Sequence, residues 1–257
     1  MQTKLIHEVR AVKSKKELEN IVKAQRIAER VLGDVLKELK DGVTEIEIAN
    51  FIKKSFVKYG APILSFPPIV AFGKNTANIH HEPGETKLKK PIRGGATVIM
   101  FDFGCTVNHY CSDMTRTYFW GEPNAKQKKI YLGVLKAMEL AMNKVGLGEK
   151  RAKIIDETVR NFLGKNFGLK RPTLMAKQTE GFPHGLGHGV GTVIHEWPNF
   201  KPKSEDILPV GCVMTIEPGL YFKNFGGIRI EDMILITKNG YKNLTNVSKD
   251  VQSAILK

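Results

Sequence analysis

Two aspartates are the first residues whose type and position suggest chemistry, because each interrupts a segment that is typical of a buried strand. Asp102 lies in the apolar run VIMFDF, and Asp113 lies in YCSDMTRTYFW. A buried carboxylate without a partner is costly, so a metal, an arginine or a hydrogen bond must compensate Asp102. If the two segments pair as a hairpin that turns near residues 107–108, the carboxylates lie close together and repel each other unless a cation lies between them. The alternative is structural, with Asp102 capping a turn and Asp113 paired with Arg116.

A glycine-rich segment, GFPHGLGHGVGTVIHE, carries the histidines His184, His188 and His195. The first two have the four-residue spacing of a helical zinc motif, but a glycine at every second position makes a helix poor there. We therefore expect an extended or looped backbone that lets a substrate or an ion approach closely. Three of the seven histidines fall within 12 residues, which disfavours the alternative of unrelated core histidines.

Two later glutamates also interrupt strand-like apolar segments: Glu217 in MTIEPGLY and Glu231 in GGIRIEDM. The structural alternative is a salt bridge between Glu231 and Arg229. Together, four carboxylates and one imidazole form a donor set that suits divalent transition metals. Four negative charges match two divalent cations, which would activate a bridging water to hydroxide at neutral pH and hold a carbonyl oxygen.

The elements that must position these residues follow from the spacing of apolar residues. The pattern predicts two helices, then a hairpin, and then the same order again. The predicted helices cover residues 15–40, 44–60, 126–145 and 151–163, and the predicted strands cover 97–103, 110–120, 211–217 and 227–237. The two halves share this order but no residue-level identity, so we expect one α+β domain built from two related halves.

Composition excludes several classes of protein. The chain has 257 residues, of which 42% are hydrophobic, and this is enough for one large core. No apolar run reaches the roughly 18 residues of a membrane span, and the start lacks the apolar region of a secretory signal, so we expect a cytoplasmic protein without a membrane partner. The three cysteines, Cys105, Cys111 and Cys212, do not form a disulfide framework and are expected to be reduced.

The formal net charge of +14 is the one unusual global property. Basic chains often bind nucleic acid. Here the lysines and arginines form small groups along the whole chain, without a long run interleaved with aromatic residues and without a nucleic-acid-binding motif. We interpret them as solvated helix faces and do not expect a nucleic-acid partner.

Five motifs in order resemble the pita-bread metallopeptidases, the family of methionine aminopeptidases, Xaa-Pro aminopeptidases and proline dipeptidases. The motifs are FGKNTANIHHEPG, DFGCTVNHYCSDMTRT, FPHGLGHGVGTVIHE, TIEPGLY and GIRIED, and the match runs from about Arg10 to the C-terminus. The resemblance implies the pita-bread (creatinase/aminopeptidase) fold, with two pseudo-symmetric helix-helix-hairpin halves around a curved antiparallel sheet. We expect a single catalytic domain over residues 1–257, because ligands from both halves must meet in one site. Many Xaa-Pro enzymes carry an additional N-terminal domain, and here the sequence departs from that pattern, since residues 1–14 are expected to be only a lead-in without such a domain.

The resemblance further implies a site for two divalent ions, manganese, cobalt, zinc or iron. The implied ligands are Asp102, Asp113, His188, Glu217 and Glu231, with Asp113 and Glu231 bridging the ions. All five positions are filled, which argues against a relative that has lost its ligands.

Four residues receive catalytic roles from the same resemblance. His80 corresponds to the family's catalytic histidine, with His81 as the alternative register. His195 would hold the scissile carbonyl and the tetrahedral intermediate, and His184 matches a histidine of the proline-directed branch. Glu217 would also carry a proton to the leaving amine. Imidazoles suit these tasks because they donate hydrogen bonds where negative charge develops.

The motifs SDMTRT, HGLGH and EPGLY, with a 14-residue step from Glu217 to Glu231, resemble the Xaa-Pro branch. We therefore expect an exopeptidase that hydrolyses the N-terminal peptide bond, preferentially before proline, by attack of a metal-bridging hydroxide. Its partner would be a peptide substrate, and a homodimer is a candidate assembly. The alternatives are a methionine aminopeptidase and, in a different class, a non-catalytic binding module that uses the basic surface.

Overall fold

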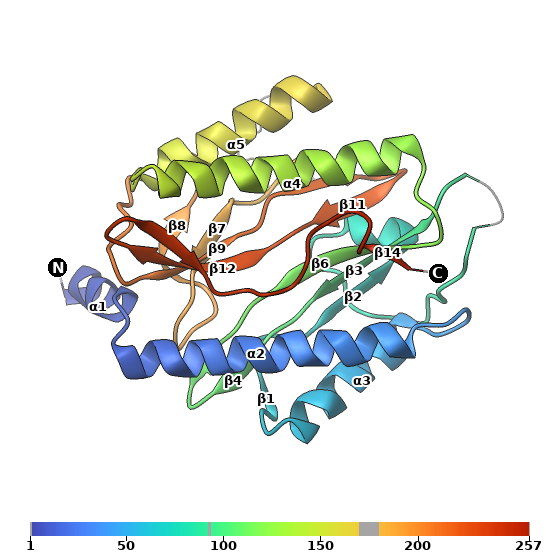
Figure 1. The fold of residues 1–257 in the computed structure, drawn as a ribbon, viewed down its shortest axis with the longest axis horizontal. Coiled ribbons are helices and arrows are strands. Elements are labelled where there is room, and N and C mark those ends of the chain that lie inside the picture. Colours follow the sequence, from blue (N-terminus) through green and yellow to red (C-terminus); the bar gives the residue numbers. More distant parts are fainter. Residues whose placement is uncertain (1, 92–93, 170–179, 257) are drawn as a thin grey trace.

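The computed structural model describes residues 2–91, 94–169 and 180–256, which form helices around mostly antiparallel sheets (Figure 1). The helices in these ranges are α1 (Gln2–Ala11), α2 (Lys15–Glu38), α3 (Glu45–Lys58), α4 (Ala125–Gly146) and α5 (Ala152–Phe167), with a short 3-10 helix η1 (Gly73–Ala77). Figure 1 shows α2 and α4 running along opposite sides of the strands, with α3 next to α2 and α5 next to α4. The two helix pairs thus flank the strands symmetrically.

The helix starts follow from local chemistry. Ser14 before α2, Thr44 before α3 and Asn124 before α4 each form a capping box with the residue three positions later, which satisfies backbone N–H groups of the first turn. The four predicted helices match α2 to α5 within a few residues. Helix α1 was missed, since residues 1–14 were expected to be only a lead-in.

The strands form two larger sheets, a small sheet and a separate hairpin. Their bounds are β1 (Ile63–Leu64), β2 (Ile69–Phe72), β3 (Thr97–Asp102), β4 (Cys105–Val107), β5 (Tyr110–Cys111), β6 (Thr115–Trp120), β7 (Gly187–Gly189), β8 (Glu196–Phe200), β9 (Val213–Ile216), β10 (Gly219–Phe222), β11 (Gly226–Arg229), β12 (Asp232–Thr237), β13 (Gly240–Asn243) and β14 (Ile255–Leu256). The sheet orders are β14-β6-β3-β2, β13-β12-β9-β7-β8 and β1-β4-β5, with β10-β11 as the hairpin. One buried hydrophobic cluster spans both halves of the chain.

The first predicted hairpin forms, but its second arm is not the continuous strand that was expected over residues 110–120. β3 pairs with β6 at the base, and β4 pairs with β5 at the tip, where Asn108 and His109 have φ of +46° and +70°. Between base and tip the arms come so close that a Cβ on Gly104 would lie 1.8 Å from the carbonyl oxygen of Ser112. This contact interrupts the strand and leaves Asp113 in an irregular segment.

In the described ranges no helix is long and apolar enough to cross a bilayer. The three cysteines are buried and free, as expected from the sequence.

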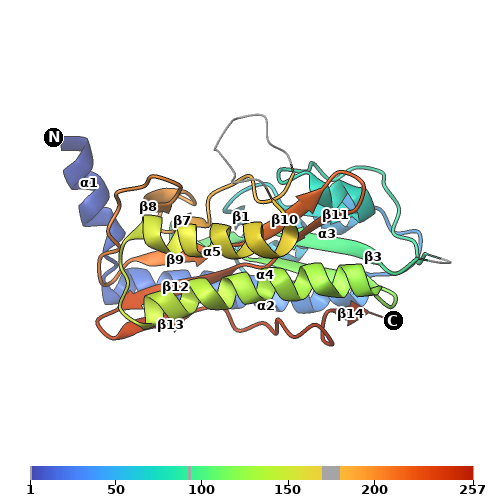
Figure 2. The same cartoon turned by 90° about the horizontal axis from the view of Figure 1, so that it is seen from above.

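Helix α1 projects at one end of the molecule (Figure 2), and polar contacts connect its C-terminal end to the rest of the protein. Ile6 and Val9 are 56% and 69% exposed, so these two apolar side chains do not pack the helix onto the core. The Lys13 side chain is 2% exposed, donates to the carbonyl oxygens of Arg10 and Ala11 at 3.0 Å each, and forms an ion pair with Glu196 at the start of β8. Lys13 therefore joins the end of α1 to β8.

Replacing Lys13 by Met should lower the free energy of unfolding by about 1–3 kcal/mol, because the buried Glu196 carboxylate loses its buried cation and keeps only the partly exposed Arg10 guanidinium at 3.4 Å. Urea unfolding followed by circular dichroism measures this loss. The control is Lys16→Met, since Lys16 is 79% exposed and its ion pair with Glu19 contributes little. Equal stability of the two variants would contradict the role of Lys13, and adding Glu196→Gln to Lys13→Met should recover part of the loss.

Candidate active site

A cavity of about 550 Å³ contains every residue that the sequence singled out for chemistry. Its wall includes the candidate residues from both halves: His80, Asp102, Asp113, His184, His188, His195, Glu217 and Glu231. The remaining wall is partly apolar and includes Phe66, Pro67, Pro68, Ile69 and Ile79. The fold thus gathers residues far apart in sequence around one concave space, as binding sites require.

The strands explain why the acidic residues meet. Asp102 ends β3, and the β3–β6 register places it opposite Thr115, two residues after Asp113. Glu217 directly follows β9, and Glu231 directly precedes β12, which pairs with β9. The backbone N–H of Glu231 donates to the carbonyl oxygen of Thr115 at 3.1 Å, and this contact joins the two halves beside the cavity.

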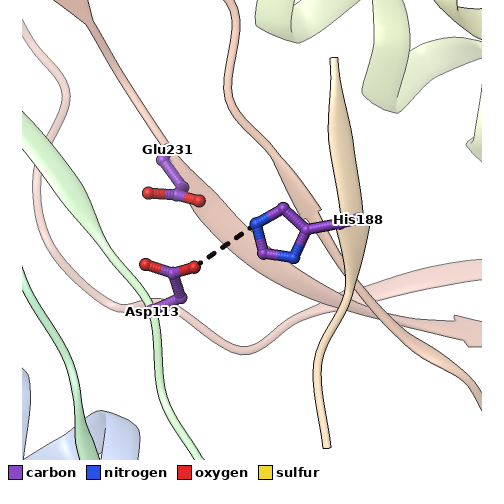
Figure 3. Close-up of side chains that lie close together, drawn as sticks. All are labelled: Asp113, His188 and Glu231. Carbon is purple, nitrogen blue, oxygen red and sulfur yellow. Dashed lines mark ion pairs between the residues drawn. The ribbon is translucent and has the colours of Figure 1, made fainter. Parts of the chain in front are cut away.

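Asp113, His188 and Glu231 form a compact group of metal-type donors. One ligand atom from each lies within 4.8 Å of the others, and Figure 3 shows the three side chains pointing toward one another from separate segments. His188 lies in β7, so the expected extended backbone is confirmed and a helix is not formed. Its Nε2 atom lies 3.5 Å from Asp113 Oδ2 and 3.5 Å from Glu217 Oε1.

The protonation of His188 also suits a metal ligand. Burial, with the nearby charge of His195 adding, lowers the pKa of His188 to about 3, so the ring is neutral at pH 7. Its Nδ1–H donates to the carbonyl oxygen of Gly189 at 3.1 Å. Nε2 is therefore the unprotonated atom, and its lone pair faces the carboxylates.

The carboxylates of this cavity repel one another. Burial raises the pKa of Asp113 and of Glu231 well above the usual range, and neighbouring carboxylates raise both further. Burial also raises the pKa of Glu217 to about 8 against the opposing effect of Arg229. Positive charge must enter the cavity if all of these groups are to ionise together near neutral pH.

Arg229 supplies one such charge, and it is bound to Asp102. Its Nη2 donates to Asp102 Oδ2 at 2.6 Å, whereas the other oxygen, Oδ1, is buried without a hydrogen-bond partner in the described part of the chain. The alternative pairing of Arg229 with Glu231 is wrong, and Glu231 instead accepts from Thr115 Oγ1 at 2.7 Å. The alternative pairing of Asp113 with Arg116 is also wrong.

Arg116 pairs instead with Asp232 at 2.7 Å, away from the cavity wall. The unpartnered oxygen of Asp102, the raised pKa values of the other carboxylates and the oxygen-rich donor set with one imidazole all fit divalent metal ions. The residues present could therefore hold the metal that such a site needs.

His184 is fixed by a residue that sequence reasoning missed, Tyr221. Arg229 Nη1 donates to the Tyr221 hydroxyl at 2.8 Å, so this hydroxyl in turn donates to His184 Nε2 at 2.9 Å. His184 Nδ1–H then donates to the carbonyl oxygen of Gly185 at 2.8 Å. Burial lowers the pKa of His184 to about 3, with the charge of Arg229 adding, so the ring is neutral.

A signal for Tyr221 was present in the glycines around it. A Cβ on Gly219 or on Gly227 would lie 2.4 Å from an atom of the Tyr221 side chain, so both positions must stay bare to admit the ring.

The other two histidines complete the wall. The rings of His188 and His195 meet edge to face with centroids 4.3 Å apart. Burial lowers the pKa of His195, and the charge of Asp102 opposes this shift. His80 and His81 also line the cavity, but His81 Nε2 lies 2.8 Å from Glu45 Oε2. Because the His81 ring is bound to Glu45, His80 is favoured over His81 as the histidine available to a substrate.

The family is decided by comparison with known proteins. The metallopeptidase family M24 matches residues 19–238. The chain belongs to this family. The resemblance seen in the motifs is thereby confirmed, and families of this type depend on metal. An uncharacterized peptidase of Staphylococcus haemolyticus is 38% identical to this chain over 244 residues. The matched region covers 95% of this chain but only 65% of the length of that relative.

Solved structures support the fold. The X-Pro aminopeptidase from Thermotoga maritima superposes with a TM-score of 0.86 at 30% identity, over 98% of this chain and 67% of the other. The prolidase from Pyrococcus furiosus gives 0.84 at 36% identity, over 95% of this chain and 68% of the other. A dipeptidase from Pyrococcus horikoshii superposes with a TM-score of 0.86 at 36% identity, over 99% of this chain and 66% of the other. The predicted pita-bread fold of this M24 chain is confirmed.

Removing the Tyr221 hydroxyl tests the network around Arg229. Tyr221→Phe should lower the free energy of unfolding by about 1–3 kcal/mol, because a buried guanidinium N–H and His184 Nε2 lose their partner. Denaturant unfolding gives the value. Tyr118→Phe is the control, since Tyr118 is a buried tyrosine whose hydroxyl has no hydrogen-bond partner among the described residues. A loss no greater than that of the control would show that the Tyr221 hydroxyl is not structurally required.

Proposed function

We propose that this chain is a dinuclear metal-dependent exopeptidase that hydrolyses the N-terminal peptide bond of peptides, preferentially before proline. The observation that carries the proposal is the single cavity in which all of the candidate residues from both halves meet, four carboxylates and four histidines. Membership of a metallopeptidase family supports the reaction class. We propose that residues 1–257 act as one catalytic domain, since one hydrophobic cluster spans both halves.

Five residues are proposed to hold two divalent ions: Asp102, Asp113, His188, Glu217 and Glu231. The unpartnered Oδ1 of Asp102 and the unprotonated Nε2 of His188 support two of these assignments directly. Asp113 and Glu231, which repel each other when both ionise, are proposed as the bridging ligands. Bound at these residues, divalent ions would polarise the scissile carbonyl and make water a nucleophile at neutral pH.

The remaining polar residues have roles that fit their protonation. His195 and His80 are proposed to donate hydrogen bonds to the substrate carbonyl as it gains negative charge. Glu217 is proposed to accept a proton at a carboxylate oxygen and to pass it to the leaving amine. His184 has both ring nitrogens engaged by Tyr221 and Gly185, so its proposed role is to shape the wall that receives the substrate.

The preference for proline is supported by the similar solved structures, which include an X-Pro aminopeptidase and a prolidase. The apolar wall formed by Phe66, Pro67, Pro68 and Ile69 suits an apolar ring such as proline. A comparison of Xaa-Pro dipeptides with longer Xaa-Pro peptides tests which substrate length is preferred.

A metal series with a peptide panel tests the activity. Protein reconstituted with manganese, cobalt, zinc or iron should cleave Xaa-Pro dipeptides or longer Xaa-Pro peptides faster than Met-Ala peptides, with product release followed by liquid chromatography. Asp113→Asn should lower kcat/KM by more than about 100-fold. Asp250→Asn, an exposed aspartate, is the charge-matched control. Metal-loaded protein that cleaves no peptide of the panel would refute the proposal, and preference for Met-Ala would indicate a methionine aminopeptidase.

Metal stoichiometry tests the two-ion site independently of activity. Titration calorimetry and native mass spectrometry should give two Mn²⁺ ions per chain for the wild type. Glu231→Gln should weaken the binding of both ions, because a bridging ligand contacts both. Glu139→Gln, at an exposed site of α4, should weaken the binding of neither ion. A wild type that saturates with one ion would contradict the dinuclear assignment.

A further inference from the structure

The segment that carries His80 has little regular structure of its own. Between η1 and β3, the described residues form no helix and no named strand. Two backbone contacts tie this segment to the first turn of α3: the N–H of Glu45 donates to the carbonyl oxygen of Thr86 at 3.1 Å, and that of Ile46 donates to Gly84 at 3.0 Å. N–H groups at a helix start have no partner within the helix, so they are available to hold a loop.

The Glu45 side chain ties the same segment more tightly. Glu45 is 0% exposed. Its Oε1 accepts from the Phe72 N–H at 2.7 Å and from Asn75 Nδ2 at 2.9 Å. Its Oε2 accepts from the Gly84 N–H at 3.2 Å and from His81 Nε2 at 2.8 Å. One carboxylate therefore joins the end of β2, η1 and both ends of the turn that follows His80.

The charge of Glu45 is compatible with full burial. It lies at the first position of α3, where the helix dipole favours an anion, and it receives four donors. A carboxylate only accepts hydrogen bonds when ionised, so His81 Nε2 carries the proton of this contact. His81 is thereby directed toward α3, and the adjacent His80 lines the cavity together with His195.

We propose that Glu45 is a positioning residue, which acts through the 78–84 loop to hold His80 against the substrate. This inference rests on the proposed function, in which His80 contacts the substrate carbonyl. Glu45 itself does not line the cavity. Catalytic geometry tolerates little displacement, so loosening this loop should slow the reaction more than it weakens substrate binding.

The substitution Glu45→Gln keeps the size of the side chain but replaces one accepting oxygen by an NH₂ group, so it cannot satisfy all four donors. We expect kcat to fall by about 10- to 100-fold while KM changes by less than about threefold. The matched control is Glu47→Gln in the same helical turn, whose capping contact with Thr44 a glutamine can retain. Equal kcat values for the two variants would overturn the proposal.

A double-mutant cycle separates positioning of His80 from general damage. If Glu45 acts through His80, then Glu45→Gln should cost less than about twofold in kcat when it is added to His80→Asn. The proposal would be overturned if the two losses multiplied. In that case Glu45→Gln would lower kcat by the same factor in the His80→Asn background as in the wild type. Metal affinity should stay at the wild-type value in all of these variants.

Hydrogen exchange tests the loop without any activity. Glu45→Gln should raise amide exchange of peptides that cover residues 78–84, whereas Glu47→Gln should leave it unchanged. If the wild-type protein hydrolysed no peptide, the proposed function would be refuted. Hydrogen exchange would then still decide, without any activity, whether Glu45 holds the 78–84 loop. Unchanged exchange at residues 78–84 would refute the inference even in an active enzyme.

Discussion

Repulsion among buried carboxylates is the constraint on which the rest of the structure depends. Asp102, Asp113, Glu217 and Glu231 share one cavity, and burial, with the charges of neighbouring carboxylates adding, raises the pKa of Asp113, Glu217 and Glu231. Such an arrangement is unstable unless cations and hydrogen bonds compensate it. Arg229 compensates one oxygen of Asp102 and leaves the other without a protein partner. The cavity is therefore complete only with additional positive charge, which is the property expected of a metal centre.

The fold holds these charges together by rigid backbone contacts. Asp102 and Asp113 belong to the hairpin of the first half, Glu217 and Glu231 belong to the paired strands β9 and β12 of the second, and the N–H contact from Glu231 to Thr115 joins them. Because the two halves are joined by this backbone contact, they hold the four carboxylates closer together than flexible loops would allow. The irregular segment around Asp113 also helps to bring the carboxylates together. Outside a regular strand, the Asp113 side chain does not have to follow the alternation of side chains between the two faces of a sheet.

The sequence was sufficient for features with local causes. The four long helices follow from apolar spacing and capping residues, and the acidic site residues were visible because each interrupts an apolar strand. Features with distant causes were not predictable in this way. The break in the 110–120 strand depends on the contact of Gly104 with Ser112, and Lys13 meets Glu196 across 183 residues. No local pattern reports such contacts, so α1 and the role of Glu45 emerged only from the structure. The glycines around Tyr221 were visible in the sequence, but the ring that they admit was not.

Glu45 and Glu196 show how further anions can serve a site already crowded with negative charge. Each lies beside a histidine-bearing loop, Glu45 against the loop of His80 and Glu196 directly after His195. The Glu45 charge is offset by four donors and the start of α3, and the Glu196 charge is offset by Lys13. Their charges are neutralised locally, so they can anchor loops without adding to the repulsion in the cavity. Histidines can thus project from irregular backbone and still be held with the precision that catalysis requires.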